Sequence, residues 1–438
     1  MAPVSSAATL DSITSLCKRR GFVYQTASIY GGLNGVYDIG PLGVLLKENI
    51  RNMWKRSILT SKGETLFLEG SLLGPSQVWE ASGHVANFHD PMVDCLNCKH
   101  RFRADDIDLN KACSNCGIKN WTDVRQFNMM FKTNLGATED QASVAYLRPE
   151  TAQSIFINFK NIISSNRVKI PFGVGQIGKA FRNEITPKQF LFRMREFEQM
   201  EMEWFCKAET ARETFEYWCQ KRLEFYDMIG IKKENVRLRS HEKDELSHYS
   251  QYTSDVEYQF PFGWKEVEGI AYRGNFDLSQ HSKHSGKELS VFDDETKESY
   301  LPHVVETSVG ADRLFITLLF EAYHEDTADG EQRIVLRFAP AMAPYKAAFM
   351  PLTNKQAEPM HKLYAAIQAQ GIPVQYDQSG SIGKRYRRQD EIGTPFCFTF
   401  DFDSETDQCV TVRHRDSMQQ ERIAIDAVPE FLYKMLQP

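Results

Sequence analysis

The sequence contains no apolar run long enough to span a bilayer as a helix, which takes about 20 residues. It also lacks an excess of positive charge: the formal net charge is −6, so the chain as a whole does not attract nucleic acid. Its opening residues hold no arginine and lead into an amphipathic stretch, unlike a secretory signal or a transit peptide. We therefore expect no membrane partner, a cytoplasmic location, and a local basic surface for any RNA that binds.

The length of 438 residues is too great for one ordinary hydrophobic core. With 42% hydrophobic and 25% charged residues, the composition is typical of a globular chain. We expect two large domains and a small insertion.

Nine cysteines are an odd number, and a chain without a secretory signal favours free thiols or a metal site over a disulfide framework. Four of them form two Cys-x2-Cys knuckles with fourteen residues between, at Cys95, Cys98, Cys113 and Cys116. This spacing lets four thiolates bind one tetrahedral zinc ion. Because the ligand set is closed, the predicted zinc site is structural; the alternative is a metal-free loop with incidental cysteines.

Helix and strand periods are visible on both sides of the cysteine module. Residues 43–57 predict a helix with apolar residues at helical spacing, and residues 64–73 predict a strand that ends at Pro75. A further strand is expected at 143–147, with a helix from Ala152 onward.

Two stretches, 175–184 and 191–205, predict an antiparallel hairpin whose connecting loop contains Pro187. Strict alternation places one set of polar and aromatic side chains on a single face: Gln176, Arg182, Glu184, Arg193, Arg195, Phe197, Gln199, Glu201 and Glu203. Charged strand faces are usually exposed, salt-bridged surfaces. The mixture of arginine, glutamate and an aromatic ring instead suits a planar polyanion such as ATP, which is the interpretation we favour.

A third predicted strand, 264–270, places Glu266 and Glu268 on one face, as a divalent metal that bridges phosphates requires. A fourth, 304–308, precedes a glycine-led helix start at 310–313, which is typical of a phosphate contact. Past about residue 330 the chain alternates strands and helices, which indicates a second domain.

Several strings resemble those of a known family. This chain has FRNEITP followed by FRMREFEQMEMEWF, which resembles motif 2 of class II aminoacyl-tRNA synthetases. It also has ETSVGADR before an apolar helix, which resembles their motif 3. The helix, strand and Pro75 fit motif 1. Glycyl-tRNA synthetases of the homodimeric class II type are similar over YGGLNGVYDIGPLG, YLRPETAQ, EVEGIAYRGNFDL and SIGKRYRRQDEIGTPF. The resemblance thus spans almost the whole chain. One departure is Asp312, where the broader class prefers glycine.

The resemblance implies an α+β fold: a class II catalytic domain with a central antiparallel sheet over residues 1–330, a zinc-ribbon-like insertion at 93–120, and a C-terminal α/β anticodon-binding domain at 332–438. It also implies an ATP-dependent glycine–tRNA ligase that forms AMP and uses Mg²⁺, with tRNA(Gly) and a second copy of the chain as partners. The sequence left two rivals: a non-catalytic relative that keeps the fold, such as the accessory subunit of mitochondrial DNA polymerase, and a class II enzyme for proline, threonine or histidine.

The resemblance also implies roles for individual residues. Arg182 and Arg313 are the expected catalytic residues. The implied ATP-binding residues are Arg182, Asn183, Glu184, Phe192, Arg193, Arg195, Phe197, Glu266, Val267, Gly310 and Arg313. The implied glycine-binding residues are Arg103, Glu150, Phe197, Glu198, Gln199, Glu201, Glu306, Ser308 and Gly310.

A basic run in the C-terminal part is the expected tRNA contact. It consists of Lys384, Arg385, Arg387 and Arg388 around Tyr386, and it could pair phosphates and stack a base. The alternative is a solvated charge run that is balanced by Asp390 and Glu391.

Overall fold

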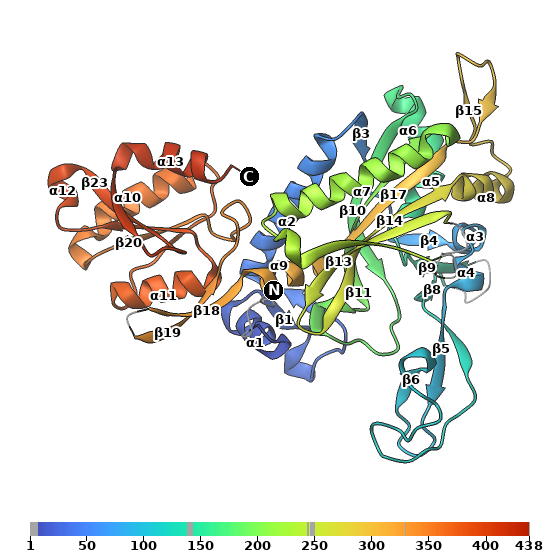
Figure 1. The fold of residues 1–438 in the computed structure, drawn as a ribbon, viewed down its shortest axis with the longest axis horizontal. Coiled ribbons are helices and arrows are strands. Elements are labelled where there is room, and N and C mark those ends of the chain that lie inside the picture. Colours follow the sequence, from blue (N-terminus) through green and yellow to red (C-terminus); the bar gives the residue numbers. More distant parts are fainter. Residues whose placement is uncertain (1–7, 138–142, 243–244, 246–249, 329, 438) are drawn as a thin grey trace.

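The computed structural model describes residues 8–137, 143–242, 245, 250–328 and 330–437. Figure 1 shows three parts: a large body built on a central sheet, a narrow arm that carries β5 and β6, and a smaller C-terminal unit. No helix in these described ranges is long and apolar enough to cross a membrane.

The central sheet has seven strands in the order β12-β13-β14-β17-β11-β10-β3. All neighbours are antiparallel except β3, which runs parallel to β10. The strands are β3 (Glu64–Phe67), β10 (Phe172–Phe181), β11 (Glu196–Cys206), β12 (Val236–Ser240), β13 (Tyr252–Phe260), β14 (Gly263–Gly274) and β17 (His303–Gly310). The expected antiparallel hairpin and central antiparallel sheet are confirmed.

One face of this sheet, the back face, is covered by long helices: α2 (Pro41–Leu59), α7 (Ala211–Met228) and α9 (Ala311–Ala322). Met200, Met202 and Trp204 of β11 point to this side and join its core. All residues of α9 except Arg313 are buried, as its apolar sequence requires. The helix expected at 43–57 is confirmed as α2.

The opposite face, the front face, carries Phe197, Gln199, Glu201 and Glu203 of β11. Its far end is covered by α5 (Ala152–Ile157) and α6 (Phe159–Asn166), where Phe156 and Phe159 pack on Phe205. The remainder of this face is flanked by shorter elements: α3 (Ser76–Ala81), α4 (His84–Asn87), α8 (Phe276–Ser285), and a sheet of β4 (Leu73–Pro75), β9 (Val144–Leu147) and β8 (Lys132–Asn134).

The strand expected at 64–73 is broken in two. β3 ends at Phe67, and the chain then leaves the central sheet to form β4, which pairs with β9. Gly70 lies at the break, where its N–H donates to the side chain of Gln176 and a Cβ would meet Ser154 at 2.4 Å. The polar Glu69–Gly70–Ser71 segment of the predicted strand is therefore a crossing between two sheets.

The arm is a three-stranded sheet of β5 (His89–Asp94), β6 (Arg101–Arg103) and β7 (Arg125–Asn128) with the cysteine knuckles at its tip (Figure 1). Small elements complete the body: α1 (Leu10–Arg20), β1 (Val23–Gln25), β2 (Tyr37–Ile39), β15 (Val291–Phe292) and β16 (Ser299–Tyr300).

The C-terminal unit is a five-stranded sheet in the order β21-β20-β22-β23-β24, and the hairpin of β18 (Tyr323–Ala328) and β19 (Glu331–Leu336) leads into it. Its elements are β20 (Ala347–Pro351), α10 (Ala357–Gln368), β21 (Val374–Tyr376), α11 (Ile382–Ile392), β22 (Phe396–Phe400), α12 (Ser404–Asp407), β23 (Cys409–His414), β24 (Gln420–Ala424) and α13 (Val428–Met435).

Side-chain contacts tie the C-terminal unit to the body. Arg19 and Arg20 of α1 form ion pairs with Glu391 of α11, the first at 2.6 Å. Asn49 of α2 donates to the carbonyls of Met342 and Ala343 in the connecting segment, at 3.1 and 3.0 Å. The two units are thus joined by more than the polypeptide.

Candidate active site

A cavity of about 300 Å³ opens on the front face of the central sheet. Its walls come from β11, β13, β14, β17, the start of α9 and the loop between β10 and β11. The predicted site residues that line it are Glu150, Arg182, Glu184, Phe192, Arg193, Phe197, Glu198, Gln199, Glu201, Glu266, Val267, Glu306, Ser308, Gly310 and Arg313. The fold therefore gathers most of the predicted set into one space.

The loop between β10 and β11 is longer than the sequence predicted. β10 ends at Phe181 and β11 begins at Glu196, so the strand expected through 182–184 and 191–195 is wrong. Gln189 and Phe190, within the loop already expected from the sequence, have positive φ angles of 61° and 55°. The loop is closed at its base by the Arg182 N–H, which donates to the carbonyl of Arg195 at 2.9 Å.

Arginines and aromatic rings occupy one end of the cavity. The guanidinium of Arg182 lies 5.3 Å from the ring centroids of both Phe88 and Phe197, in the range of cation–π contacts. Arg313 lies 4.7 Å from the ring of Phe192 and forms an ion pair with Glu266 at 3.1 Å. Planar cations and half-buried rings at this end suit a base and its phosphates.

The predicted pairing of Glu266 with Glu268 on one face is wrong. The register of β14 against β13 shifts so that Glu257 faces Glu266 and Val256 faces Glu268, which leaves Val267 as an extra residue. This β-bulge turns Glu268 to the back face, where it is fully buried and forms an ion pair with Arg222 of α7. Glu266 alone remains at the cavity.

Carboxyl groups occupy the other end. Glu201 accepts from the Ser308 hydroxyl at 2.7 Å and from the Thr151 N–H at 3.0 Å. Glu150 accepts from the Gln153 amide at 2.9 Å and lies 3.3 Å from His84. A group of ordered carboxyl side chains of this kind suits a small cation.

Burial and neighbouring charges shift the pKa values at this end. Burial raises the pKa of Glu306 to about 7, although Arg273 opposes the shift. Burial and the charge of Glu150 raise the pKa of Glu201. Burial alone would raise the pKa of Glu150, but the adjacent His84 and Arg273 hold it below its ordinary value.

Glu198 and Asp312 form a buried ionic group with α2. Glu198 points away from Phe197 and Gln199, and Arg51 donates to it at 2.7 Å. Asp312 accepts from Lys47 at 2.7 Å and from the Glu198 N–H at 2.7 Å. Asp312, the departure from the class pattern, therefore links α9, β11 and α2. The carboxylate of Glu198, which was expected to contact glycine, faces this group instead.

Three predicted residues do not line the cavity: Arg103, Asn183 and Arg195. Arg103 forms an ion pair with Asp90 at 3.0 Å on the arm. The guanidinium of Arg195 donates to the Glu184 carbonyl and, at 2.8 Å, to that of Asn34. Arg195 thus orders the loop, whereas Arg103 acts on the cavity only through its charge, which opposes the rise of the Glu184 pKa that burial causes.

A layer of residues beneath the carboxyl end was not predicted from the sequence. Arg273 of β14 is 2% exposed and donates to Asp277 at 2.8 and 2.9 Å and to Glu306. The amide of Gln153 donates to Asp277 at 3.0 Å, and its oxygen pairs with His281 at 2.7 Å. Alternation from Glu266 and Glu268 would have placed Arg273 on the opposite face, because the bulge at Val267 reverses the sides beyond it. No local signal marks the others.

Comparisons with known proteins agree with this geometry. An anticodon binding domain model matches residues 346–435. The glycine–tRNA ligase of Caldanaerobacter subterraneus subsp. tengcongensis is 50% identical over 98% of this chain and 98% of its own length. That of Acetivibrio thermocellus is 50% identical over 95% and 96%, and that of Geobacillus thermodenitrificans 48% identical over 98% of both chains.

The chain belongs to the glycine–tRNA ligase family.

The fold is also that of a solved class II structure outside the glycine–tRNA ligase family. Prolyl-tRNA synthetase from Cryptosporidium parvum superposes with a TM-score of 0.68, covering 100% of this chain and 77% of its own. Because the sequences are only 15% identical, this likeness shows the class II fold alone. The fold class predicted from the sequence is confirmed.

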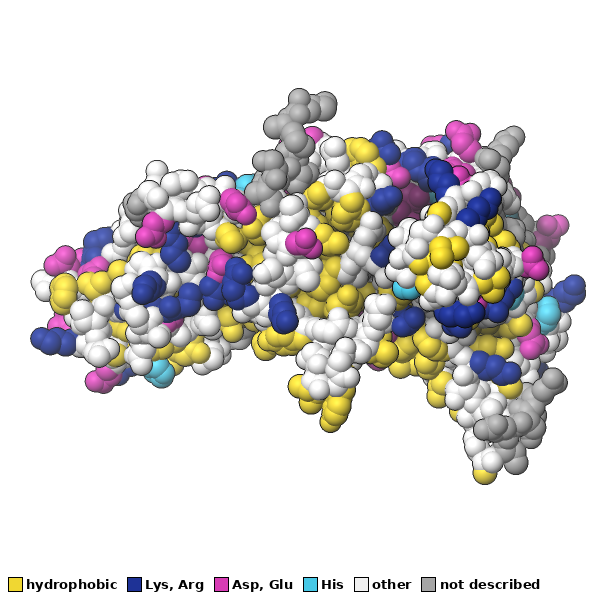
Figure 2. All heavy atoms as spheres, turned by 90° about the horizontal axis from the view of Figure 1, so that it is seen from below, with side chains coloured by type: hydrophobic (Ala, Val, Ile, Leu, Met, Phe, Trp, Pro, Cys, Tyr) yellow, Lys and Arg dark blue, Asp and Glu magenta, His cyan; other side chains and the backbone are white. Residues whose placement is uncertain are grey.

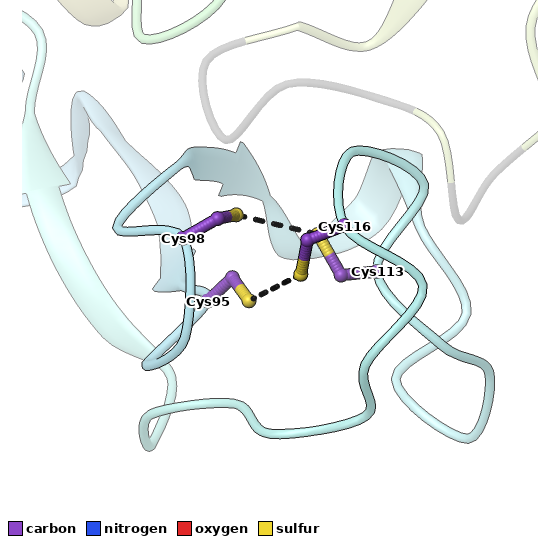
Figure 3. A group of neighbouring side chains, drawn as sticks. All are labelled: Cys95, Cys98, Cys113 and Cys116. Atoms are coloured by element: carbon purple, nitrogen blue, oxygen red, sulfur yellow. Dashed lines mark hydrogen bonds between the residues drawn. The ribbon is translucent and has the colours of Figure 1, made fainter.

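In this member of the glycine–tRNA ligase family, the four clustered cysteines meet at the tip of the arm (Figure 3). Their Sγ atoms lie within 4.8 Å of one another, with Cys95 to Cys116 at 3.6 Å and Cys98 to Cys113 at 3.8 Å. Sulfurs bound to one tetrahedral ion at about 2.3 Å would lie at comparable separations. The cluster could hold a metal ion.

In this glycine–tRNA ligase family member the basic run lies within α11, and the helix turns its side chains into different surroundings. Lys384 is exposed, but Arg385 is 4% exposed and donates to the carbonyls of Pro351, Asp377 and Gly380. Arg388 pairs with Asp377 at 2.7 Å. The expected phosphate contact of Arg385 is therefore wrong, because its guanidinium is buried and hydrogen-bonded within the C-terminal unit.

The alternative balance by Asp390 and Glu391 is also wrong. Asp390 is fully buried and pairs with Arg333 and Arg413 at 3.2 and 2.8 Å. Glu391 pairs with the two arginines of α1 described above. Neither carboxylate neutralises the basic run.

Proposed function

We propose that the chain joins glycine to tRNA(Gly) in two steps. The carboxylate of glycine attacks the α-phosphorus of ATP and releases pyrophosphate; a ribose hydroxyl at the 3′ end of the tRNA then attacks the glycyl-adenylate and releases AMP. One observation carries this proposal: a single cavity holds arginines at one end and carboxyl groups at the other, in a chain 50% identical to a glycine–tRNA ligase over 98% of its length. Positioning and charge supply the catalysis.

Glycine binds at the carboxyl end in this proposal. Glu150, Glu201 and Glu306 surround its ammonium group, and the Ser308 hydroxyl orients Glu201 by donating to it. The contacts that already hold these side chains fix their directions before glycine arrives. The glycine carboxylate then faces the arginine end, where ATP binds.

ATP binds across the arginine end. Its adenine stacks on Phe197, while Arg182 meets the α-phosphate and Arg313 and Arg193 meet the distal phosphates. Charge that develops on the α-phosphate during attack is stabilised by Arg182, and Arg313 holds the leaving pyrophosphate. Neither task requires a nucleophilic side chain.

Magnesium is the expected companion of ATP. Glu266 fits such an ion, because its carboxylate lines the cavity and is 49% exposed, and hard cations prefer carboxylate oxygen. A bound Mg²⁺ would neutralise phosphate charge. Glu268 takes no part, since it is buried on the back face.

Amino-acid-dependent exchange of pyrophosphate into ATP tests the function directly. Glycine should support exchange, whereas alanine, serine, proline, threonine and histidine should not. Exchange that another amino acid supports better than glycine would overturn the assignment. Absence of exchange with every amino acid would favour a non-catalytic relative.

We propose that the four cysteines bind one structural zinc ion per chain. Four thiolates form a closed tetrahedral set with no open position for a substrate. Elemental analysis of protein purified without added metal should find about one zinc per chain. A metal-free preparation that keeps full activity and stability would contradict this assignment.

We propose that the chain acts as a homodimer. The apolar face of α2 cannot supply the interface, because Leu46, Ile50 and Trp54 are buried in the chain's own core. Exposed apolar side chains lie instead before α2, where Ile29 and Tyr30 are each 86% exposed. Hydrophobic side chains also gather over the middle of the face drawn in Figure 2. Sedimentation at micromolar concentration should give twice the chain mass.

We propose that the C-terminal unit contacts tRNA through Lys384, Arg387 and Arg388, and that the reaction takes place in the cytoplasm. The anticodon binding domain match over 346–435 includes all three residues. Replacing the three with glutamine should weaken tRNA binding and flatten its salt dependence, since fewer counterions are released. Glycine-dependent pyrophosphate exchange should persist, because it needs no tRNA. Unchanged tRNA affinity would mean that these three side chains are solvated surface charges that do not contact tRNA.

A further inference from the structure

Glu203 is a fully buried carboxyl group beneath the cavity. It is 0% exposed, and neither of its carboxyl oxygens has a hydrogen-bond partner within the structure. It lies on the front face of β11, two residues beyond Glu201 and directly opposite Glu306 on β17. Cross-strand neighbours of like charge repel each other, so this arrangement is costly if both groups are ionised.

The surroundings of this pair hold more acid than base. The charged and titratable groups around it are Glu201 on β11, Arg273 on β14, Asp277 and His281 on α8, and Glu150 with His84 at the mouth. Arg273 already donates twice to Asp277 and once to Glu306. Arg273 is the one arginine of this set, and it cannot offset every carboxylate. Buried anions that lack a counter-charge take up protons instead.

We propose that the glycine-free enzyme holds a proton on the Glu203–Glu306 pair and that the ammonium group of glycine displaces it on binding. This inference rests on the proposed function, in which glycine enters beside Glu306. The ammonium supplies the positive charge that the proton supplied before, and the proton passes to bulk solvent. No bond other than the O–H bond of the carboxyl group is broken.

The direction of the pKa shifts agrees with this assignment. Burial, followed by the charge of Glu306, raises the pKa of Glu203 well above its ordinary value. An ammonium group placed at Glu306 acts in the opposite sense on both carboxyl groups. Glu203 is thus a positioning residue: it does not touch glycine, but it sets the charge of the group that does.

Proton release can be counted by calorimetry. Glycine is titrated into the full chain at pH 6.5 in buffers of different ionisation enthalpy, and the slope of heat against that enthalpy gives the protons released. Wild-type protein should release about one proton per glycine, falling as the pH is raised to 9. The KM for glycine should correspondingly fall as the pH rises.

Two variants separate this role from a purely structural one. Glu203→Gln leaves only Glu306 to hold the proton, and Glu306, with a pKa of about 7, is mostly ionised at pH 8. At pH 8 the variant should therefore release close to no proton where wild type still does, and its KM for glycine should lose its pH dependence above pH 7. Glu321→Gln is the matched control, because Glu321 is also a buried glutamate, held by Asn235 and Tyr258 on the back side of the sheet. This control should release as many protons as wild type.

The outcomes distinguish this inference from the proposed function. Glycine-dependent exchange with no proton release from wild type overturns only the inference, as does undiminished release from Glu203→Gln. Loss of glycine-dependent exchange from wild type would overturn the proposed function itself. Should Glu203→Gln fail to fold, infrared difference spectra of wild type decide: glycine must remove the C=O stretch of a protonated carboxyl group, and an unchanged band refutes the inference.

Discussion

The two ends of the cavity are built differently. At the arginine end, the side chains of Arg313 and Arg193 are 29% and 27% exposed, and their ion pairs with glutamate lie at 3.1 and 3.9 Å. At the carboxyl end, Glu201 and Arg273 are nearly inaccessible and each makes several hydrogen bonds. In the proposed function glycine binds at the carboxyl end, and because glycine is too small to supply much binding energy, we expect its pocket to be ordered in advance. ATP has enough charge and area to draw its own ligands into place.

Removing an arginine from the open end should have the largest effect. Arg182→Ala or Arg313→Ala should lower glycine-dependent pyrophosphate exchange by at least about a hundredfold, on the scale of losing one oriented charge contact in a transition state. The rate at saturating ATP and glycine measures this effect. Near-normal exchange in both variants would mean that the exposed arginines do not meet the reacting phosphate.

At the buried carboxyl end, the raised pKa of Glu306 should make the free energy of unfolding depend on pH. The pKa of Glu306 is raised to about 7 from an ordinary value of 4.5, so the native state binds more protons than the unfolded state between these values. The free energy of unfolding of wild type relative to Glu306→Gln should therefore fall as the pH rises from 4.5 to 7. The total change is at most about 3 kcal/mol, since each pKa unit corresponds to about 1.4 kcal/mol.

Denaturant unfolding of both proteins across this pH range measures the difference. Below pH 4.5 the group is protonated in both states, and above pH 7 it is ionised in both, so the difference should level off on each side. A difference that does not vary with pH would show that Glu306 titrates normally and that this end is wetter than the structure shows.

A smaller effect is expected from Glu150→Gln. This change keeps the hydrogen-bonding shape but removes one charge facing the ammonium group, so the KM for glycine should rise about tenfold. The KM for ATP in the same variant is the control and should stay within about twofold of wild type. Equal increases in the KM for glycine and the KM for ATP would contradict the assignment of glycine and ATP to different ends of the cavity.

Much of the site follows from sequence because strand alternation and motif spacing are local properties. Phe197, Gln199 and Glu201 were placed correctly on one face, since β11 is regular over that stretch. Glu268 was not, because one extra residue in β14 reverses the side on which it lies. Alternation cannot detect a bulge that the partner strand induces.

Burial of charge was harder to predict than secondary structure. Arg385 belongs to a basic run, yet its guanidinium is enclosed by carbonyls of Pro351, Asp377 and Gly380, all from segments before its own helix. Arg273, which the sequence analysis passed over, organises the carboxyl end through partners on α8 and β17. The contacts of Arg385 with Pro351 and of Arg273 with Glu306 join segments 34 and 33 residues apart, so they are defined only once the chain has folded.

The contacts between Glu391 and the arginines of α1, together with those from Asn49 to the connecting segment, have a mechanical meaning. They hold the C-terminal unit at a set separation from the cavity. In the proposed function, a tRNA that binds the C-terminal unit must therefore present its acceptor end at that distance to reach the cavity. We expect this spacing to select RNA by its length and shape, and we expect replacement of Glu391 to weaken the selection without altering either binding surface.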